Sequence, residues 1–116
     1  FQQNIRDAVE HSEKISFKPA TNTINNVVIT GLGGSGIGGL IVSKIVSDYA
    51  TAPIMINNNY TLPGFVDKNT LVIVCSYSGN TEETLSALND AQEKNAEIAC
   101  LTSGGNVKEI AESNGY

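Results

Sequence analysis

The sequence of 116 residues predicts an α/β fold, built as an open parallel sheet with helices on both faces. Two observations lead to this prediction. Short runs of consecutive apolar residues, many of them β-branched, recur along the chain, as expected of parallel strands that are buried on both faces. Segments with apolar residues at helical spacing follow most of these runs. This alternation indicates strand–helix units joined by right-handed crossovers, and we expect a flavodoxin-like strand order.

The chain is expected to begin with an amphipathic helix over residues 2–15, followed by a polar linker. The residues that recur at helical spacing in this first segment are Ile5, Ala8, Val9 and Ser12. Lys18 and Pro19 open the linker. We therefore divide the chain into a leading helix with its linker, residues 1–20, and one subdomain, residues 21–116.

Within the subdomain, the apolar runs predict the ranges of the strands, and the helical spacing of apolar residues predicts the ranges of the helices. Strands are expected over residues 26–30, 53–56, 71–75 and 98–101, and helices over residues 40–50, 81–94 and 107–112. A glycine-rich turn, residues 31–39, separates the first strand from its helix, and a loop, residues 57–66, replaces the helix after the second strand. Another strand is expected after Tyr116, so we expect a truncated subdomain and an absent C-terminal partner subdomain.

Charge and cysteine usage narrow the classes of function. A net charge of −5 argues against broad nucleic-acid binding, and no apolar run approaches the roughly 18 residues of a membrane span. Cys75 and Cys100 lie in apolar runs without C-x-x-C spacing, and the only histidine, His11, lies in the polar first helix. We expect no metal site, no nucleic acid and no membrane partner, and two buried thiols in a reducing, cytoplasmic compartment.

The turn after the first strand carries the first candidate site. Six of the eleven glycines fall between Gly31 and Gly39, and Ser35 adds a hydroxyl among them. Glycines let the backbone approach a ligand closely, and the start of the following helix offers free N–H groups. This is chemistry suited to an anion, most simply a phosphate.

The same turn also fits a dinucleotide-binding pattern. Gly31, Gly33 and Gly36 satisfy G-x-G-x-x-G, but that pattern expects an acidic residue after the second strand, where residues 57–59 are all asparagine. No Gly-Lys-Ser/Thr follows the glycines, which excludes a nucleoside-triphosphate loop. The dinucleotide interpretation is therefore the weaker one, and we expect no cofactor.

The turn after the third strand carries the second candidate site. Ser76, Ser78 and Thr81 place three hydroxyl groups within six residues. Thr81 suits the N-cap of the next helix, and Glu82 and Glu83 suit its first turn. Capping needs one hydroxyl rather than three, so the set favours a phosphate held by hydroxyls and helix N–H groups without Lys or Arg.

These two turns together resemble the sugar isomerase (SIS) domain. Over longer stretches, VVITGLGGSGIGG at residues 27–39 and SYSGNTEET at residues 76–84 resemble the bifunctional phosphoglucose/phosphomannose isomerases. The leading helix, the linker and the loop at residues 60–63 are also similar, so the resemblance covers nearly the whole chain. It implies that the chain is the N-terminal half of such an enzyme.

The resemblance also implies a substrate and a reaction. Ser76, Ser78 and Thr81 would hold the phosphate of a sugar 6-phosphate, and Gly34 and Ser35 would contact the sugar or the phosphate. The family interconverts glucose 6-phosphate or mannose 6-phosphate with fructose 6-phosphate through an enediolate, without a metal or cofactor, as a homodimer. Its catalytic residues would lie beyond Tyr116.

Several readings stay open on the sequence alone. A non-catalytic phosphosugar-sensing module is the alternative function, and another SIS enzyme is a further one. Glu82 and Glu83 are the only carboxylates beside the candidate site, and we interpret them as stabilising the helix N-terminus. Tyr60 and Tyr77 could contact a sugar or only cover the turns.

Overall fold

A parallel sheet of four strands forms the centre of the computed structural model, which describes residues 1–116. The strands are β1 (Asn26–Thr30), β2 (Ile54–Asn57), β3 (Thr70–Ser76) and β4 (Glu97–Thr102), in the spatial order β2-β1-β3-β4. This is the expected flavodoxin-like order, in which β1 and β3 lie side by side although β2 intervenes in sequence. The predicted α/β class is confirmed.

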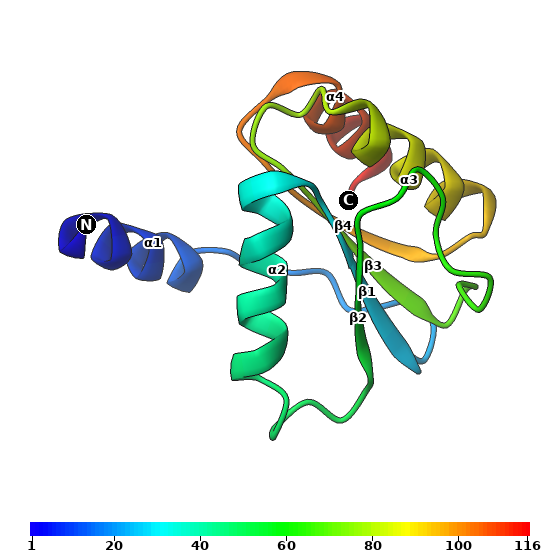
Figure 1. The fold of residues 1–116 in the computed structure, drawn as a ribbon, viewed down its shortest axis with the longest axis horizontal. Coiled ribbons are helices and arrows are strands. Elements are labelled where there is room, and N and C mark those ends of the chain that lie inside the picture. The colour runs from blue at the N-terminus through cyan, green and yellow to red at the C-terminus, as the bar shows by residue number, and fades with distance from the viewer.

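The helices are distributed unevenly around this sheet. They are α1 (Gln2–Glu13), α2 (Gly33–Ile45), α3 (Glu82–Glu93) and α4 (Gly105–Asn114). Figure 1 shows α2 on one face of the sheet and α3 with α4 on the other, while α1 stands apart beyond α2. None of the helices has the length and apolar character needed to cross a membrane.

The hydrophobic core lies between the sheet and the pair α3 and α4. Side chains on one face of β1 and β3 meet apolar residues of both helices and of the loop after β2. The buried members are Val28, Leu62, Val66, Val72, Val74, Ala87, Leu88, Ala91 and Val107. The loop is held against this core because the Leu62 N–H donates to Oδ2 of Asp90 at 2.8 Å.

The structure corrects the prediction for the glycine-rich segment. We expected a turn over residues 31–39 and a helix over residues 40–50, but α2 starts at Gly33 and ends at Ile45. Glycine normally disfavours helix, yet here it lets α2 lie against the sheet. A Cβ on Gly39 would lie 2.7 Å from Cγ2 of Ile29 in β1. Close packing against β1 therefore overrides local propensity.

The other elements match their predicted positions to within a few residues. Helix α1 ends at Glu13 rather than residue 15, and no helix forms between β2 and β3. The expectation that both thiols are buried holds for Cys75 but is wrong for Cys100, which is only partly buried. Cys100 lies on β4, an edge strand of the sheet, where fewer neighbours cover its side chain.

Candidate functional site

The two turns singled out in the sequence meet at one edge of the sheet. Strands β1 and β3 pair in parallel, with Thr30 beside Val74, so their carboxyl ends point the same way. The turns also approach each other closely, because a Cβ on Gly31 would lie only 2.8 Å from the carbonyl oxygen of Cys75. In open α/β sheets, ligands bind beyond the carboxyl ends of strands at such a switch point.

The second turn is organised around the Ser76 hydroxyl. Ser76 is buried, and its Oγ accepts a hydrogen bond from the Gly79 N–H at 3.1 Å. The same Oγ lies 3.3 Å from Oγ1 of Thr81. Ser78 is exposed, and its Oγ accepts from the Asn80 N–H at 3.2 Å. The hydroxyls of Ser76 and Thr81 thus converge, and Ser78 lies on the rim of the turn.

The start of α3 differs in one detail from the expected cap. Thr81 occupies the N-cap position, but its side chain makes no capping hydrogen bond. Because its Oγ1 lies near Ser76 instead, it is directed into the turn. Glu82 and Glu83 occupy the first turn of α3, as predicted. Desolvation, followed by the charges of these two carboxylates, raises the pKa of Tyr60, which therefore lies beside them.

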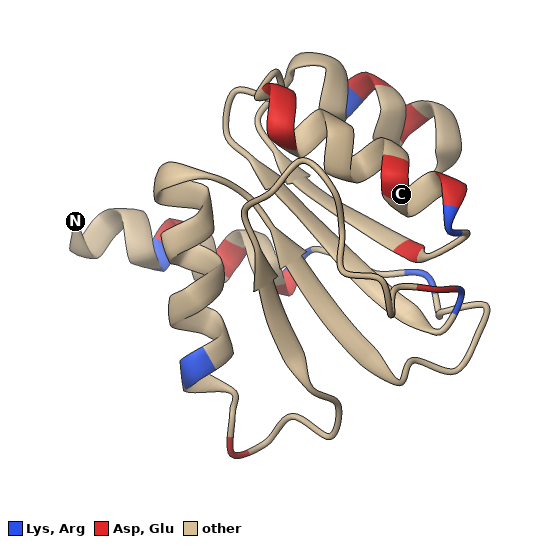
Figure 2. Ribbon diagram, turned by 45° about the vertical axis from the view of Figure 1, so that its right-hand side comes forward, with Lys and Arg blue, Asp and Glu red and all other residues tan.

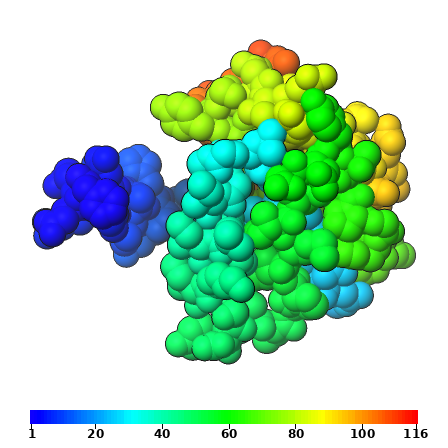
Figure 3. Space-filling view, in the orientation of Figure 1, coloured from blue at the N-terminus to red at the C-terminus, as the bar shows by residue number.

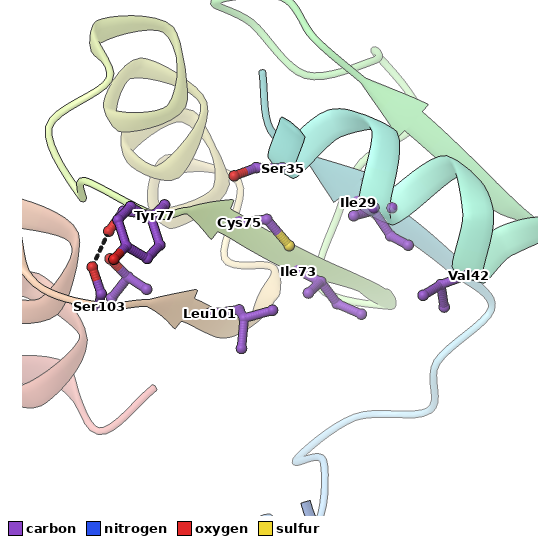
Figure 4. Close-up of a pocket in the computed structure, with 11 residues that line it drawn as sticks. Ile29, Ser35, Val42, Ile73, Cys75, Tyr77, Leu101 and Ser103 are labelled. Carbon is purple, nitrogen blue, oxygen red and sulfur yellow. Dashed lines mark hydrogen bonds between the residues drawn. The ribbon is translucent and has the colours of Figure 1, made fainter. Parts of the chain in front are cut away.

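A third turn, between β4 and α4, supports the second. The carbonyl of Tyr77 accepts from both the N–H and the hydroxyl of Ser103, as Figure 4 shows for the hydroxyl. The Gly79 carbonyl accepts from the Val107 N–H at 2.9 Å, and Oδ1 of Asn80 accepts from the Asn106 N–H at 3.0 Å. No sequence motif predicts these partners. The pair Gly104-Gly105 is the one local signal, since two adjacent glycines mark a turn that allows close contact.

The first turn contributes the N-terminus of α2. Ser35 is partly buried there and Gly34 is exposed. The Ser35 N–H donates to the Leu32 carbonyl at 3.1 Å, whereas the N–H groups of Gly33 and Gly34 belong to the first helical turn, which has no partners within its own helix. These N–H groups point out of the N-terminal end of α2, the end that the helix dipole makes favourable for anions. Backbone donors and a hydroxyl are therefore available from this side.

Hydroxyl and amide groups, rather than cations, dominate both turns. Residues 31–43 and 76–86 contain no Lys or Arg, and Figure 2 shows the basic residues scattered over other parts of the molecule. No group of three His, Cys, Asp or Glu side chains is arranged to hold a metal ion. His11 lies on the exposed α1, with Nδ1 2.8 Å from the Asp7 carbonyl. The arrangement suits an anionic ligand recognised by directed hydrogen bonds.

An apolar hollow of about 580 Å³ lies beside the turns, on the face of the sheet that carries α2. Ser35 and Tyr77 contribute to its lining near the turns, and the Cys75 side chain points into it (Figure 4). Burial raises the pKa of the Cys75 thiol. This hollow does not contain the Ser76, Ser78 or Thr81 side chains, and its lining of aliphatic groups does not suit a sugar phosphate.

The model of the SIS domain family matches residues 22–112, a range that contains both turns. The chain belongs to this family. It is 49% identical over 114 residues to a bifunctional phosphoglucose/phosphomannose isomerase of Caldicellulosiruptor bescii, covering 98% of this chain and 34% of that protein. It is also 49% identical over 90 residues to the Thermoplasma acidophilum protein of the same name, covering 78% of this chain and 28% of the relative.

A solved structure shows the same fold. A protein from Clostridium difficile 630, assigned as a phosphosugar isomerase, superposes with a TM-score of 0.76 at 22% identity, covering 90% of this chain and 32% of that one. The chain thus spans about a third of the length of the relatives that it matches. The chain therefore corresponds to the N-terminal part of such an isomerase.

Proposed function

We propose that this chain supplies the phosphosugar-binding half of an aldose–ketose isomerase. The reaction interconverts glucose 6-phosphate or mannose 6-phosphate with fructose 6-phosphate. One observation carries the proposal: two turns of hydroxyl and backbone N–H donors lie side by side at the carboxyl ends of β1 and β3. The sequence similarity to phosphoglucose/phosphomannose isomerases supports the substrate class.

The phosphate is proposed to bind the second turn. Ser76, Ser78 and Thr81 supply hydroxyl donors, and the N-terminus of α3 adds its positive dipole end. Gly34 and Ser35, at the N-terminus of α2, are proposed to contact the sugar or the phosphate. The Ser76 Oγ accepts a hydrogen bond from the Gly79 N–H, which restrains the position of this oxygen within the turn.

The proton transfer needs a base that these turns do not supply. Isomerisation moves a proton between C2 and C1 of the open-chain sugar through an enediolate. Glu82 and Glu83, the carboxylates nearest the turns, lie at the N-terminus of α3 beside Tyr60 and are accounted for by that position. We therefore propose that the chain binds sugar phosphate but does not isomerise it alone. The homodimer and the cytoplasmic location stay predictions.

A titration followed by amide chemical shifts tests the binding site. Fructose 6-phosphate is expected to shift the resonances of residues 76–81, whereas fructose without phosphate leaves them unchanged. Shifts centred on residues 31–36 with NAD alone would contradict the proposal and favour a dinucleotide site. The absence of a response to all three compounds would contradict the claim that this half binds the ligand by itself.

An isomerisation assay separates the enzyme reading from a phosphosugar-sensing module. The chain alone is expected to give no turnover of fructose 6-phosphate. Turnover at enzyme-like rates would show that the base lies within these residues. A sensor is favoured instead if the protein that contains this chain binds sugar phosphate tightly and also fails to turn it over.

A further inference from the structure

The sheet face that carries α2 is only partly covered. Helix α2 packs on β1, β2 and β3, and β4 is left open at its carboxyl end, where the Leu101 side chain is 67% exposed. The apolar hollow lies over this open area. Its aliphatic lining is formed by Ile29, Val42, Ile73 and Leu101, together with the Cys75 thiol (Figure 4).

This hollow has the chemistry of a helix-packing surface. Parallel sheets in α/β proteins are normally covered on both faces, because apolar residues project from each. Side chains with a polar group occur only near the turns, at Ser35, Tyr77, Thr102 and Ser103. A ligand seated there would find few hydrogen-bonding partners, whereas an apolar helix face would bury the exposed Leu101.

Helix α1 presents a matching apolar face without a partner. It buries none of its residues, and Ile5 and Val9, which are one turn apart, are each about half exposed. Figure 3 shows α1 joined to the rest of the molecule only through a narrow neck. A helix of 12 residues is marginal in water unless it packs on something, since isolated helices need about 12–15 residues even with favourable composition.

The tether between α1 and the sheet has a suitable length and attachment point. Oε1 of Glu97, at the start of β4, accepts hydrogen bonds from the N–H groups of Thr21 and Asn22. The seven residues 14–20 between this anchor and α1 reach about 23 Å when extended. Helix α1 is about 18 Å long and β4 about 20 Å, so the helix can lie along the whole strand.

We infer that α1 docks in the hollow of its own chain, antiparallel to β4, with Ile5, Val9 and Ala8 against Ile73, Leu101 and Cys75. The carboxyl end of α1 then lies near Thr21, and its polar face with Gln3, Asp7 and Glu10 faces solvent. Docking within one chain is favoured over docking onto a second copy, because a short tether keeps α1 at an effective concentration of about millimolar. Figure 1 places α1 on the α2 side of the sheet, so no crossing of the sheet is needed.

The Cys75 thiol reports on this docking. In a Cys100→Ala background, Cys75 is the only thiol, and it is 9% exposed with its side chain in the hollow. We expect the double variant Ile5→Asp/Val9→Asp to raise the rate of Cys75 alkylation at least about fivefold, since docking would cover the hollow. The matched control Arg6→Gln/Lys14→Gln, which also lowers the net charge by two but changes no residue of the apolar face, should leave the rate unchanged.

Amide hydrogen exchange and sedimentation test the docking of α1 independently of the thiol. Amide hydrogen exchange over residues 5–10 should be slowed at least about tenfold in the parent and lost in Ile5→Asp/Val9→Asp. Equal alkylation rates and equal exchange in the two double variants would overturn the inference. Protection that disappears on dilution, together with a dimer in sedimentation, would assign the hollow to the α1 of a second copy and would equally overturn it.

Discussion

The carboxylate of Glu97 binds the backbone and the side chain of Asn22, which precedes it by 75 residues. Oε1 accepts from the Asn22 N–H at 3.0 Å and from Nδ2 at 3.3 Å, and also from the Thr21 N–H at 2.8 Å. This oxygen therefore fixes the end of the linker to the first residue of β4. It is the point from which the leading segment departs.

The first prediction concerns this anchor. Glu97→Ala removes an acceptor that serves three donors, so we expect the free energy of unfolding to fall by about 1–2 kcal/mol. Glu97→Gln keeps one acceptor oxygen and should cost less. Chemical denaturation measures both, with Glu109→Gln on the exposed side of α4 as the control. Equal stability of Glu97→Ala and the control would show that the linker is not held this way.

Two neighbouring glycines of α2 give the second prediction. A Cβ on Gly38 meets nothing within 4 Å, whereas one on Gly39 would lie 2.7 Å from Cγ2 of the buried Ile29. Gly38→Ala should stabilise the protein by up to about 1 kcal/mol through helix propensity. Gly39→Ala should destabilise it by about 1–3 kcal/mol through overpacking. Thermal unfolding of both variants checks this, and the same sign for both would contradict the packing of α2 on β1.

The hydroxyls of the second turn give the third prediction. Thr81→Val and Ser78→Ala each remove one proposed hydrogen bond to the phosphate, so fructose 6-phosphate should bind about five- to tenfold more weakly. Calorimetric titration measures the affinity. Ser43→Ala in α2, whose hydroxyl donates to the Leu40 carbonyl, removes a hydroxyl away from the turn and serves as the control. Unchanged affinity in both site variants would remove the turn from the proposed function.

The support of this turn gives the fourth prediction. Gly79 has a φ of +72°, and a Cβ on it would lie 1.7 Å from the carbonyl oxygen of Gly104. Gly79→Ala must therefore push the second turn away from the third turn, which lies between β4 and α4. We expect a loss of stability of at least about 2 kcal/mol and the loss of sugar-phosphate binding. Gly64→Ala, where a Cβ would meet nothing within 4 Å, is the comparison that should keep both properties.

The cysteines give a prediction on pH. Burial, followed by the neighbouring Cys75, raises the pKa of Cys100 from 9.0 to about 11. The folded state therefore holds this thiol proton more tightly than the unfolded state, and stability from this source is full below pH 9 and falls as the pH rises toward 11. The parent should lose more stability than Cys100→Ala between pH 8 and pH 10.5. Parallel losses in the two proteins would show that Cys100 does not contribute.

Much of this architecture follows from local patterns, and the failures have physical reasons. Runs such as Val27-Val28-Ile29 predicted their strands because parallel strands buried on both faces need continuous apolar residues. The start of α2 was wrong because glycine signals a turn locally, while the close contact of Gly39 with Ile29 is tertiary. The contact between Asn80 and Asn106 spans 26 residues, so no local pattern could indicate it.

The placement of the candidate site residues depended on topology. Ser76 and Gly31 are far apart in sequence, and they come together because β3 pairs directly with β1. The flavodoxin-like strand order, expected from the sequence, predicts that the two turns lie next to each other. The inward orientation of the Thr81 side chain was not predictable, because capping of α3 and contact with Ser76 compete for the same hydroxyl.

The absence of basic side chains from both turns determines how the proposed ligand binding should depend on salt concentration. The chain carries a net charge of −5, so the phosphate of the proposed ligand would approach against long-range repulsion and would be held by short-range donors. Dissolved ions screen the repulsion beyond about 8 Å at physiological ionic strength but leave hydrogen bonds largely intact. Added salt should therefore strengthen binding modestly, the opposite of what a site built from lysine and arginine would show.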